Sequence, residues 1–145
     1  MATISTVKMA YYTIPKAGIA GEKTITARFS PTELSADVTA GDVIALADLP
    51  KTAQILAAGV RVIGAVGEAN GFVQAQIIEN STAYTLTNPL ATSYSGSAAM
   101  VSAPPPVSTS YVKTWGLLVG GGNFDNAATG ILEATIRIDD YAEAG

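Results

Sequence analysis

The chain has 145 residues, 48% of them hydrophobic and 14% charged, and a formal net charge of −4. It contains no histidine and no cysteine, which excludes Ser-His-Asp and Cys-His catalysis, metal sites built on imidazole or thiolate groups, and disulfide bonds. The eight lysines and arginines are scattered without a run, so the clustered basic surface that nucleic-acid binding needs is not predicted.

The proportion of charged residues is low, because an average soluble domain has about 25%. A monomer could cover itself with Thr, Ser, Ala, Asn and Gly instead. The other explanation is that part of the surface packs against another subunit, where charges would have to be desolvated. The length suits one domain with its own core. We therefore expect a component of a larger assembly.

No targeting or membrane segment is predicted. The first residues, MATISTVKMAYYTIP, lack the basic start and uninterrupted apolar stretch of a secretory signal. The longest apolar region, residues 55–66, contains Arg61 and is shorter than the roughly 20 residues that a membrane-spanning helix needs. We expect a soluble protein that is made in the cytoplasm and has no membrane partner.

Residues 1–22 predict an N-terminal arm, because a proline and two glycines interrupt them. Their only dense patch is YYTI at residues 11–14. Short arms bounded by glycines often lie on a neighbouring subunit, so we predict Tyr11, Tyr12 and Ile14 as partner-binding residues. A partly ordered terminus is the alternative. Residues 23–145 are predicted to form a single domain.

The first half of this domain predicts strands with one short turn of helix. TITARF (residues 24–29) alternates apolar and polar residues, as a half-buried strand does. SPTEL (30–34) has Ser as a possible N-cap, Pro in the first position and Glu three residues after Ser, which allows a single helical turn. VIALA (43–47) predicts a buried strand ended by Leu-Pro. Residues 54–65 allow a helix up to Ala58, but a glycine and the β-branched VRVI favour a strand.

The second half predicts strands at residues 72–78, 83–88, 111–119 and 131–139. The side chains predicted to point inward are those of Val73, Ala75, Ile77, Trp115, Leu117, Val119, Leu132, Ala134, Ile136 and Ile138. We interpret the glycine-rich residues 120–130 as a hairpin turn, and the triproline at 104–106 as a stiff connector. About eight short strands with turn signals between them predict an all-β fold, an antiparallel β-sandwich or barrel.

Patterns that could support catalysis or metal binding are weak. The triplet Gly120 to Gly122 lacks the Lys-Ser/Thr pair of a phosphate-binding loop, and neither Ser-x-x-Lys pattern lies in a predicted helix. Asp125, Asp139 and Asp140 could supply calcium ligands, but no EF-hand loop is present and solvated polar turns explain them. We predict no catalytic residues, no cofactor and no metal. Converging carboxylates, which sequence cannot exclude, would make the protein an enzyme.

The segments GDVIALADLPKTAQIL, AAGVRVIGA and SYVKTWGLLVGGGNFDNAATGILEATIRIDDY occur in an order that resembles small jelly-roll capsid decoration (head-stabilising, or cement) proteins of tailed bacteriophages. The resemblance covers about residues 24–141 and does not include the arm or the triproline. It implies a jelly-roll-like sandwich, a homotrimer that binds the major capsid protein shell on the outside of the virion, and stabilisation of the shell by bridging of capsomers.

An alternative is a head-fibre or tail-associated jelly-roll module that binds a receptor or glycan. Exposed aromatic side chains near acids would favour it, because sugar rings stack on aromatic faces. The candidate tyrosines for such a platform are Tyr11, Tyr12, Tyr84, Tyr94 and Tyr111. Tyrosines on strands more often pack as half-buried residues, so we favour the decoration protein.

Overall fold

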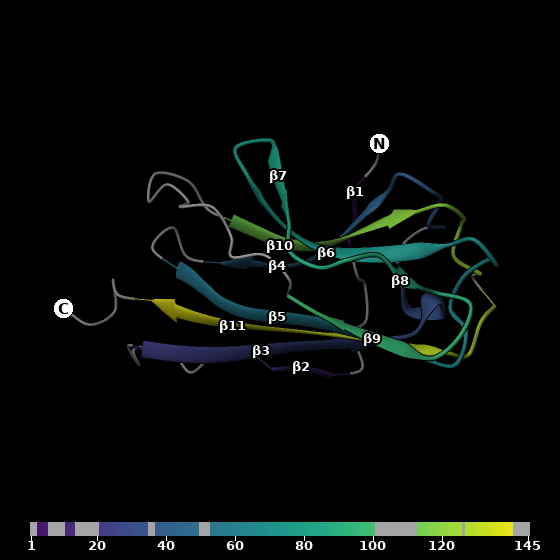
Figure 1. Cartoon of the computed structure of the whole chain (residues 1–145), viewed down its shortest axis with the longest axis horizontal. Helices are drawn as coiled ribbons and strands as arrows, with labels where there is room; N and C mark the ends of the chain where they lie inside the picture. The colour runs from purple at the N-terminus through teal and green to yellow at the C-terminus, as the bar shows by residue number, and fades with distance from the viewer. Residues whose placement is uncertain are drawn as a thin grey trace.

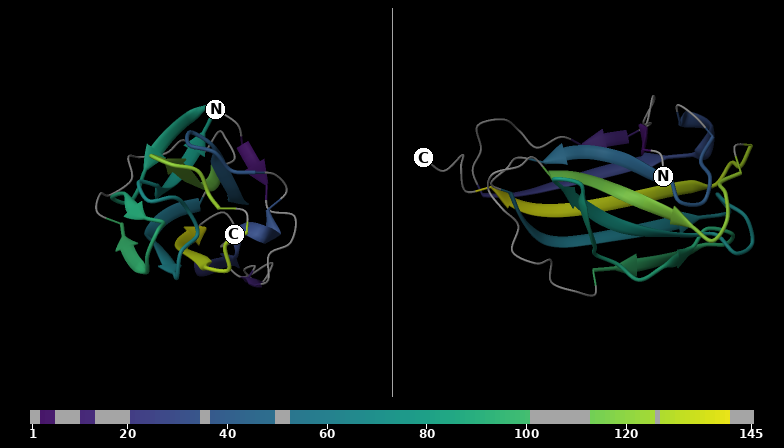
Figure 2. Two further views of the ribbon diagram at one scale, coloured as in Figure 1. Left: turned by 90° about the vertical axis from the view of Figure 1, so that its right-hand side faces the viewer. Right: turned by 90° about the horizontal axis from the view of Figure 1, so that it is seen from above.

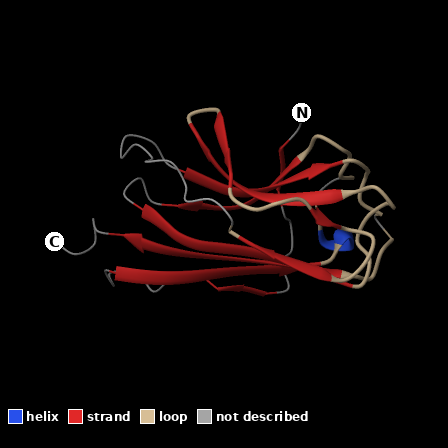
Figure 3. Cartoon of the chain, viewed as in Figure 1, coloured by secondary structure: helices blue, strands red, loops and turns tan. Residues whose placement is uncertain are grey.

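The protein is a sandwich of two β-sheets, and many of its described loops lie at one end (Figures 1 and 3). The computed structural model describes residues 3–5, 11–13, 21–34, 37–49, 53–100, 113–125 and 127–140. The strands are β1 (Thr3–Ser5), β2 (Tyr11–Thr13), β3 (Gly21–Phe29), β4 (Val43–Leu49), β5 (Ala53–Ile63), β6 (Phe72–Glu79), β7 (Thr82–Thr85), β8 (Leu90–Ala91), β9 (Gly96–Ala99), β10 (Lys113–Gly120) and β11 (Ile131–Asp140). Apart from β1, β2 and β8, each has four residues or more, which confirms the predicted all-β sandwich of about eight strands.

The strand order is that of a jelly roll. One sheet runs β1-β4-β10-β6-β7, with β8 beside β6, and the other runs β2-β3-β11-β5-β9. The chain is therefore folded back along itself: β3 pairs with β11, β4 with β10, β5 with β9, and β6 with β7, all antiparallel. Successive pairs alternate between the two sheets. Figure 2 shows the sandwich in end view and from above. The predicted jelly-roll topology is confirmed.

The core lies between the sheets and consists of the inward-facing half of each alternating strand. Because side chains on a strand point alternately to opposite faces, every second residue is buried. Trp115, the only tryptophan of the chain, is fully buried on β10. All the side chains predicted to point inward on β6, β10 and β11 are buried, as are Ile25, Ala27 and Phe29 on β3.

The ambiguous segment 54–65 forms a strand throughout its first ten residues. β5 runs without interruption from Ala53 to Ile63 and lies between β11 and β9. β11 pairs with it from Ala53 to Ile63, and β9 pairs with it from Gly59 to Val62. This pairing takes up backbone hydrogen bonds that a helix would need, so the helix that the sequence allows up to Ala58 does not form. No helix among the described residues is long and apolar enough to cross a membrane.

The predicted helical turn is confirmed as a 3-10 turn, η1 (Pro31–Glu33), capped where Ser30 N donates to Glu33 Oε2 at 3.3 Å.

The prediction of a hairpin at residues 120–130 is wrong. β10 and β11 belong to different sheets, so this segment crosses from one sheet to the other. The glycines in this segment instead allow backbone conformations and contacts that a side chain would prevent. Gly121 has a φ of +71°, and a Cβ on Gly130 would collide with the backbone of Ala65. The tight hairpin is at β6–β7, where Asn80 and Ser81 have φ of 48° and 67°, as a two-residue type I′ turn requires.

The described parts of residues 1–22 lie along both sheets. β1 pairs in parallel with β4, and β2 pairs antiparallel with β3. β3 begins at Gly21, inside the segment predicted to be an arm. The division into an arm at 1–22 and a domain at 23–145 stays a prediction. The triproline lies outside the described residues.

Candidate interaction surface

All three arginines of the chain lie on the outer face of the five-stranded sheet. Arg28 is on β3, Arg61 on β5 and Arg137 on β11, and each is flanked along its strand by buried residues. Since alternate residues share a face, all three side chains project away from the core. Because every arginine of the chain lies on this one face, it is a candidate surface for binding an acidic group.

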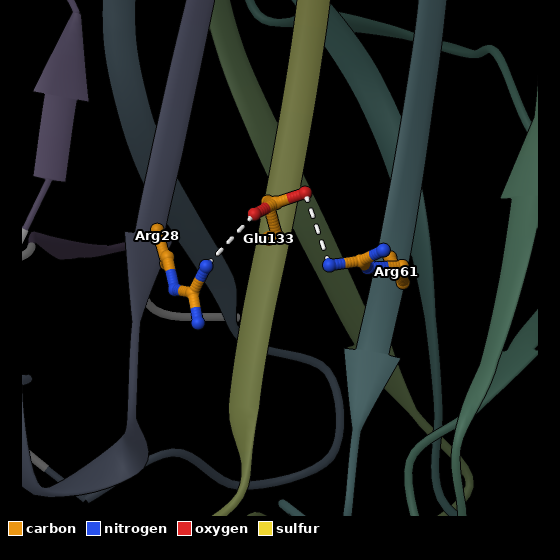
Figure 4. Close-up of polar contacts among 3 residues, drawn as sticks. All are labelled: Arg28, Arg61 and Glu133. Carbon is orange, nitrogen blue, oxygen red and sulfur yellow. Dashed lines mark hydrogen bonds and ion pairs between the residues drawn. The ribbon is translucent and has the colours of Figure 1, made fainter.

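Glu133 on β11 lies between two of these arginines. It is directly opposite Arg28 on one side and Arg61 on the other. Arg28 Nη1 lies 3.4 Å from Glu133 Oε2, and Arg61 Nη2 lies 3.8 Å from Glu133 Oε1 (Figure 4). The Glu133 side chain is 25% exposed and that of Arg61 is 53% exposed, so solvent screens the pairs and each contributes little to stability.

Two shallow, open depressions lie beside Arg61. One, of about 250 Å³, is formed over β5, β9 and β11, where Gly59, Ala99 and Thr135 have small side chains and Glu133 and Arg61 supply the charges. The other, of about 490 Å³, is lined by Arg61, Val62, Ile63, Ser95, Gly96 and Ser97. Arg61 and Ser97 thus line both depressions.

The exposed large hydrophobic side chains of the described residues are those of Ile63 and Tyr94. Ile63 lines the second depression and is 36% exposed. Tyr94 is 64% exposed and precedes Ser95, whose Oγ accepts a hydrogen bond from Gly64 N at 2.8 Å. A guanidinium, an aliphatic side chain and serine hydroxyls therefore line this depression, and Tyr94 adjoins it in the sequence. We call Arg61, Ile63, Ser95 and Ser97 the Arg61 patch.

The loops at the end of the sandwich carry charge of the opposite sign. Residues 30–42, 64–71 and 120–130 contain five acids and no lysine or arginine. Backbone hydrogen bonds such as Phe124 N to Val38 O and Asp125 N to Val66 O join these loops. The other seven acids and eight basic residues nearly balance, so the net charge of −4 comes from this loop end.

Several of these acids have structural roles. Asp42 Oδ2 accepts hydrogen bonds from Thr39 N at 2.9 Å and from Thr39 Oγ1 at 3.1 Å, and Glu68 Oε1 accepts one from Asn123 N at 2.7 Å. Asp125, considered above as a calcium ligand, receives a hydrogen bond from Ala127 N at 3.0 Å. It precedes β11 whereas Asp139 lies near the end of that strand, so the two do not meet. Among the described residues no group of three or more acids is placed to hold a metal ion.

The predicted partner-binding residues lie beside the arginine cluster where they are described. The backbones of Tyr11 and Tyr12 pair with Arg28 and Ala27 at the edge of the five-stranded sheet. Ile14 lies outside the described residues. Sequence reasoning did not find the Arg61 patch. Alternation placed Arg28 and Glu133 on outward faces, but only the pairing of β3, β11 and β5 brings them together.

Comparisons with known proteins identify a shared fold. No protein-family model matches the chain, and no curated protein matches it. A chain in the capsid of Ralstonia phage GP4 is similar, with a TM-score of 0.61 and 16% identity over 95% of this chain and 97% of that chain. A chain in the cyanophage Pam1 capsid asymmetric unit is similar with a TM-score of 0.55 and 16% identity, over 90% of this chain and 93% of that chain. These figures show that the two capsid chains and this protein have the same fold.

Proposed function

We propose that the protein is a structural virion protein that binds the outside of a phage capsid and stabilises the shell by bridging capsomers. The observation that carries this proposal is the likeness to the Ralstonia phage GP4 capsid chain, because it spans 95% of this chain and 97% of that one. The match thus spans nearly the full length of both chains that were compared. The protein is not an enzyme in this proposal.

Charge supports an exterior position. Packaged DNA is polyanionic, and a protein of net charge −4 without a basic run gains nothing from contact with it. The protein would be made in the host cytoplasm and join the virion there. Its partners would be the major capsid protein shell and further copies of itself, in a homotrimer. Many weak contacts, repeated over a shell, would add through avidity.

The test is co-sedimentation of the purified protein with expanded, undecorated capsids of the same phage. Saturable binding at a fixed number of copies per capsomer is the expected result, together with greater resistance of decorated shells to heat. Contradiction would come from an absence of sedimenting protein at concentrations up to about 100 μM, since affinities weaker than roughly −5.5 kcal/mol would not fill the shell.

The second candidate is a head-fibre or tail-associated module that binds a receptor or glycan. Tyr94 is 64% exposed, and the next residue in the chain, Ser95, lines a depression with serine hydroxyls. This exposure favours the second candidate, because a sugar ring could stack on the phenol. Binding to a glycan array together with an absence of binding to capsids would move the assignment to this class.

A further inference from the structure

Strand β7 forms an unprotected edge of its sheet. Among the described residues it pairs on one side only, with β6, and no strand lies beyond it. In Figure 1 the β6–β7 hairpin projects from the sandwich. Edge strands are usually protected by a charge, a proline or a bulge, because their backbone groups otherwise pair with another chain. β7 has the sequence TAYT and an unbroken register with β6, so it contains none of these.

The hydrogen-bond pattern determines which residues of β7 offer their backbone to a further strand. Leu86 N donates to Ala75 O at 2.8 Å, and the β6–β7 register continues without a shift from there to the turn. Because hydrogen-bonded and non-hydrogen-bonded pairs alternate along an antiparallel ladder, every second residue back from Leu86 also bonds to β6. The residues between them, Ala83 and Thr85, direct their N–H and C=O groups away from β6. Among the described residues none pairs with these groups.

One register satisfies both residues in two copies of the chain at once. When β7 of a second copy lies antiparallel on this edge, Ala83 can pair with Thr85 of the second copy, and Thr85 with Ala83 of the second copy, in hydrogen-bonded pairs. Tyr84 then lies opposite Tyr84 of the second copy, in a non-hydrogen-bonded pair whose Cα atoms are about 4.5 Å apart. Aromatic pairs across two strands stabilise a sheet.

The two neighbouring symmetric registers leave a residue without a suitable partner. With Ala83 opposite Ala83 of the second copy, Thr85 would meet Ser81, which lies in the turn with a φ of 67°. With Thr85 opposite Thr85 of the second copy, Ala83 would meet Thr87, which is already bridged to Met100. The edge is therefore complementary to itself in the register that places Tyr84 on the two-fold axis.

We propose that β7 is a self-pairing edge, through which two copies of this protein join so that their β1-β4-β10-β6-β7 sheets become continuous. The same surface is used on both copies, so the contact closes with two. It is separate from the contacts of the homotrimer proposed above and does not depend on capsid binding. One short strand from each copy buries far less area than a stable dimer, so the pairing is transient in solution and strengthens where copies are held close together.

A disulfide trap tests this contact, because the chain has no cysteine and the disulfide of a single-cysteine variant must join two copies. Tyr84→Cys places the two thiols on the two-fold axis, at a Cα separation that a disulfide spans. Ala83→Cys is the matched control. Its position is the neighbouring one and is exposed, but its two thiols lie on opposite sides of the axis, too far apart to bond. The linked fraction is measured on non-reducing gels after equilibration with reduced and oxidised glutathione.

We expect about tenfold more linked protein for Tyr84→Cys than for Ala83→Cys. Adding Ala83→Lys and Thr85→Lys to Tyr84→Cys should lower the yield to that of the control, because like charges then lie opposite each other. Mixing this protein with the counterpart that carries Ala83→Glu and Thr85→Glu should restore the yield as mixed pairs, and salt should weaken the restoration. Both charged positions are exposed, and urea unfolding midpoints establish that each variant is folded.

Equal yields for Tyr84→Cys and Ala83→Cys would overturn the proposal and leave this edge to a strand of another protein or without a partner. A high yield that the two lysines do not lower would overturn it as well, because the copies would then meet through another surface. Neither outcome bears on the proposed function, which the capsid co-sedimentation tests separately.

Discussion

Lys113 of β10 lies directly opposite Glu79 of β6, and both side chains are buried between the sheets. Lys113 is fully inaccessible to solvent and Glu79 is 7% exposed. Opposite residues on neighbouring strands have Cβ atoms within about 5.5 Å. The sandwich thus keeps two opposite charges inside its core, where a single unpaired charge would be costly.

A double-mutant cycle should show strong coupling between these two residues. Lys113→Met leaves a buried carboxylate without the charge opposite it, and Glu79→Met leaves a buried ammonium, so we expect each to lower the free energy of unfolding by about 3 kcal/mol. The double variant should lose less than the sum of the two. Urea denaturation followed by the fluorescence of Trp115, the only tryptophan, measures all three. Strictly additive losses would show that the two charges do not interact.

The sheet-crossing segment should be intolerant of a side chain at Gly130. The added Cβ of Gly130→Ala would overlap the backbone of Ala65, which cannot move aside as a side chain could. We expect a loss of about 1–3 kcal/mol, typical of overpacking. Gly59→Ala is the control, because its Cβ would meet only Ala98 O at 3.5 Å. That variant should be neutral or more stable by up to about 1 kcal/mol, since glycine inside a strand is unfavourable. Equal losses in both would contradict the structure of this crossing.

The β6–β7 turn should be improved by glycine. Ser81 adopts a φ of 67°, a left-handed conformation that costs a residue with a Cβ about 1–2 kcal/mol. Ser81→Gly removes this cost but gives the unfolded chain more freedom, so we expect a net gain of about 0.5 kcal/mol. Ala83→Gly, two residues further on β7, should instead destabilise the protein. Thermal unfolding distinguishes the two, and a lower melting temperature for Ser81→Gly would argue against the type I′ turn.

Removal of residues 2–20 should separate binding from folding. The described part of this segment contributes two strands of three residues each, at the margins of the sheets, whereas the core residues whose burial is described lie beyond it. We expect the truncated protein to unfold cooperatively, and to lose binding to capsids if the arm contacts the shell or an adjacent subunit. Retained binding at wild-type affinity would end the prediction for Tyr11, Tyr12 and Ile14.

The strand pattern was predictable because its period is two. In TITARF the apolar positions alternate strictly, and FVQAQII and ILEATIRID alternate along most of their length, with an extra apolar residue at their ends. The buried face of β3, β6 and β11 therefore follows from the residues alone. β5 was ambiguous since AQILAAG suits a helix as well as a strand. Only its pairing with β11 and β9 decides the matter.

Strand pairing over long sequence separations was not predictable. Arg28 and Glu133 are 105 residues apart, and nothing local indicates that they face each other. For the same reason the glycine-rich residues 120–130 were predicted as a hairpin. A glycine-rich connection has the same composition whether the next strand returns to its own sheet or crosses to the other. The Arg61 patch follows from that topology, so it could be found only in the folded protein.

The central claim, that the protein binds the outside of a capsid shell, is tested most directly by electron cryo-microscopy of expanded capsids incubated with the protein. We expect added density on the outer surface at repeated positions between capsomers, into which the jelly-roll sandwich fits. Shells that stay bare, or density confined to the lumen or to the tail, would contradict it.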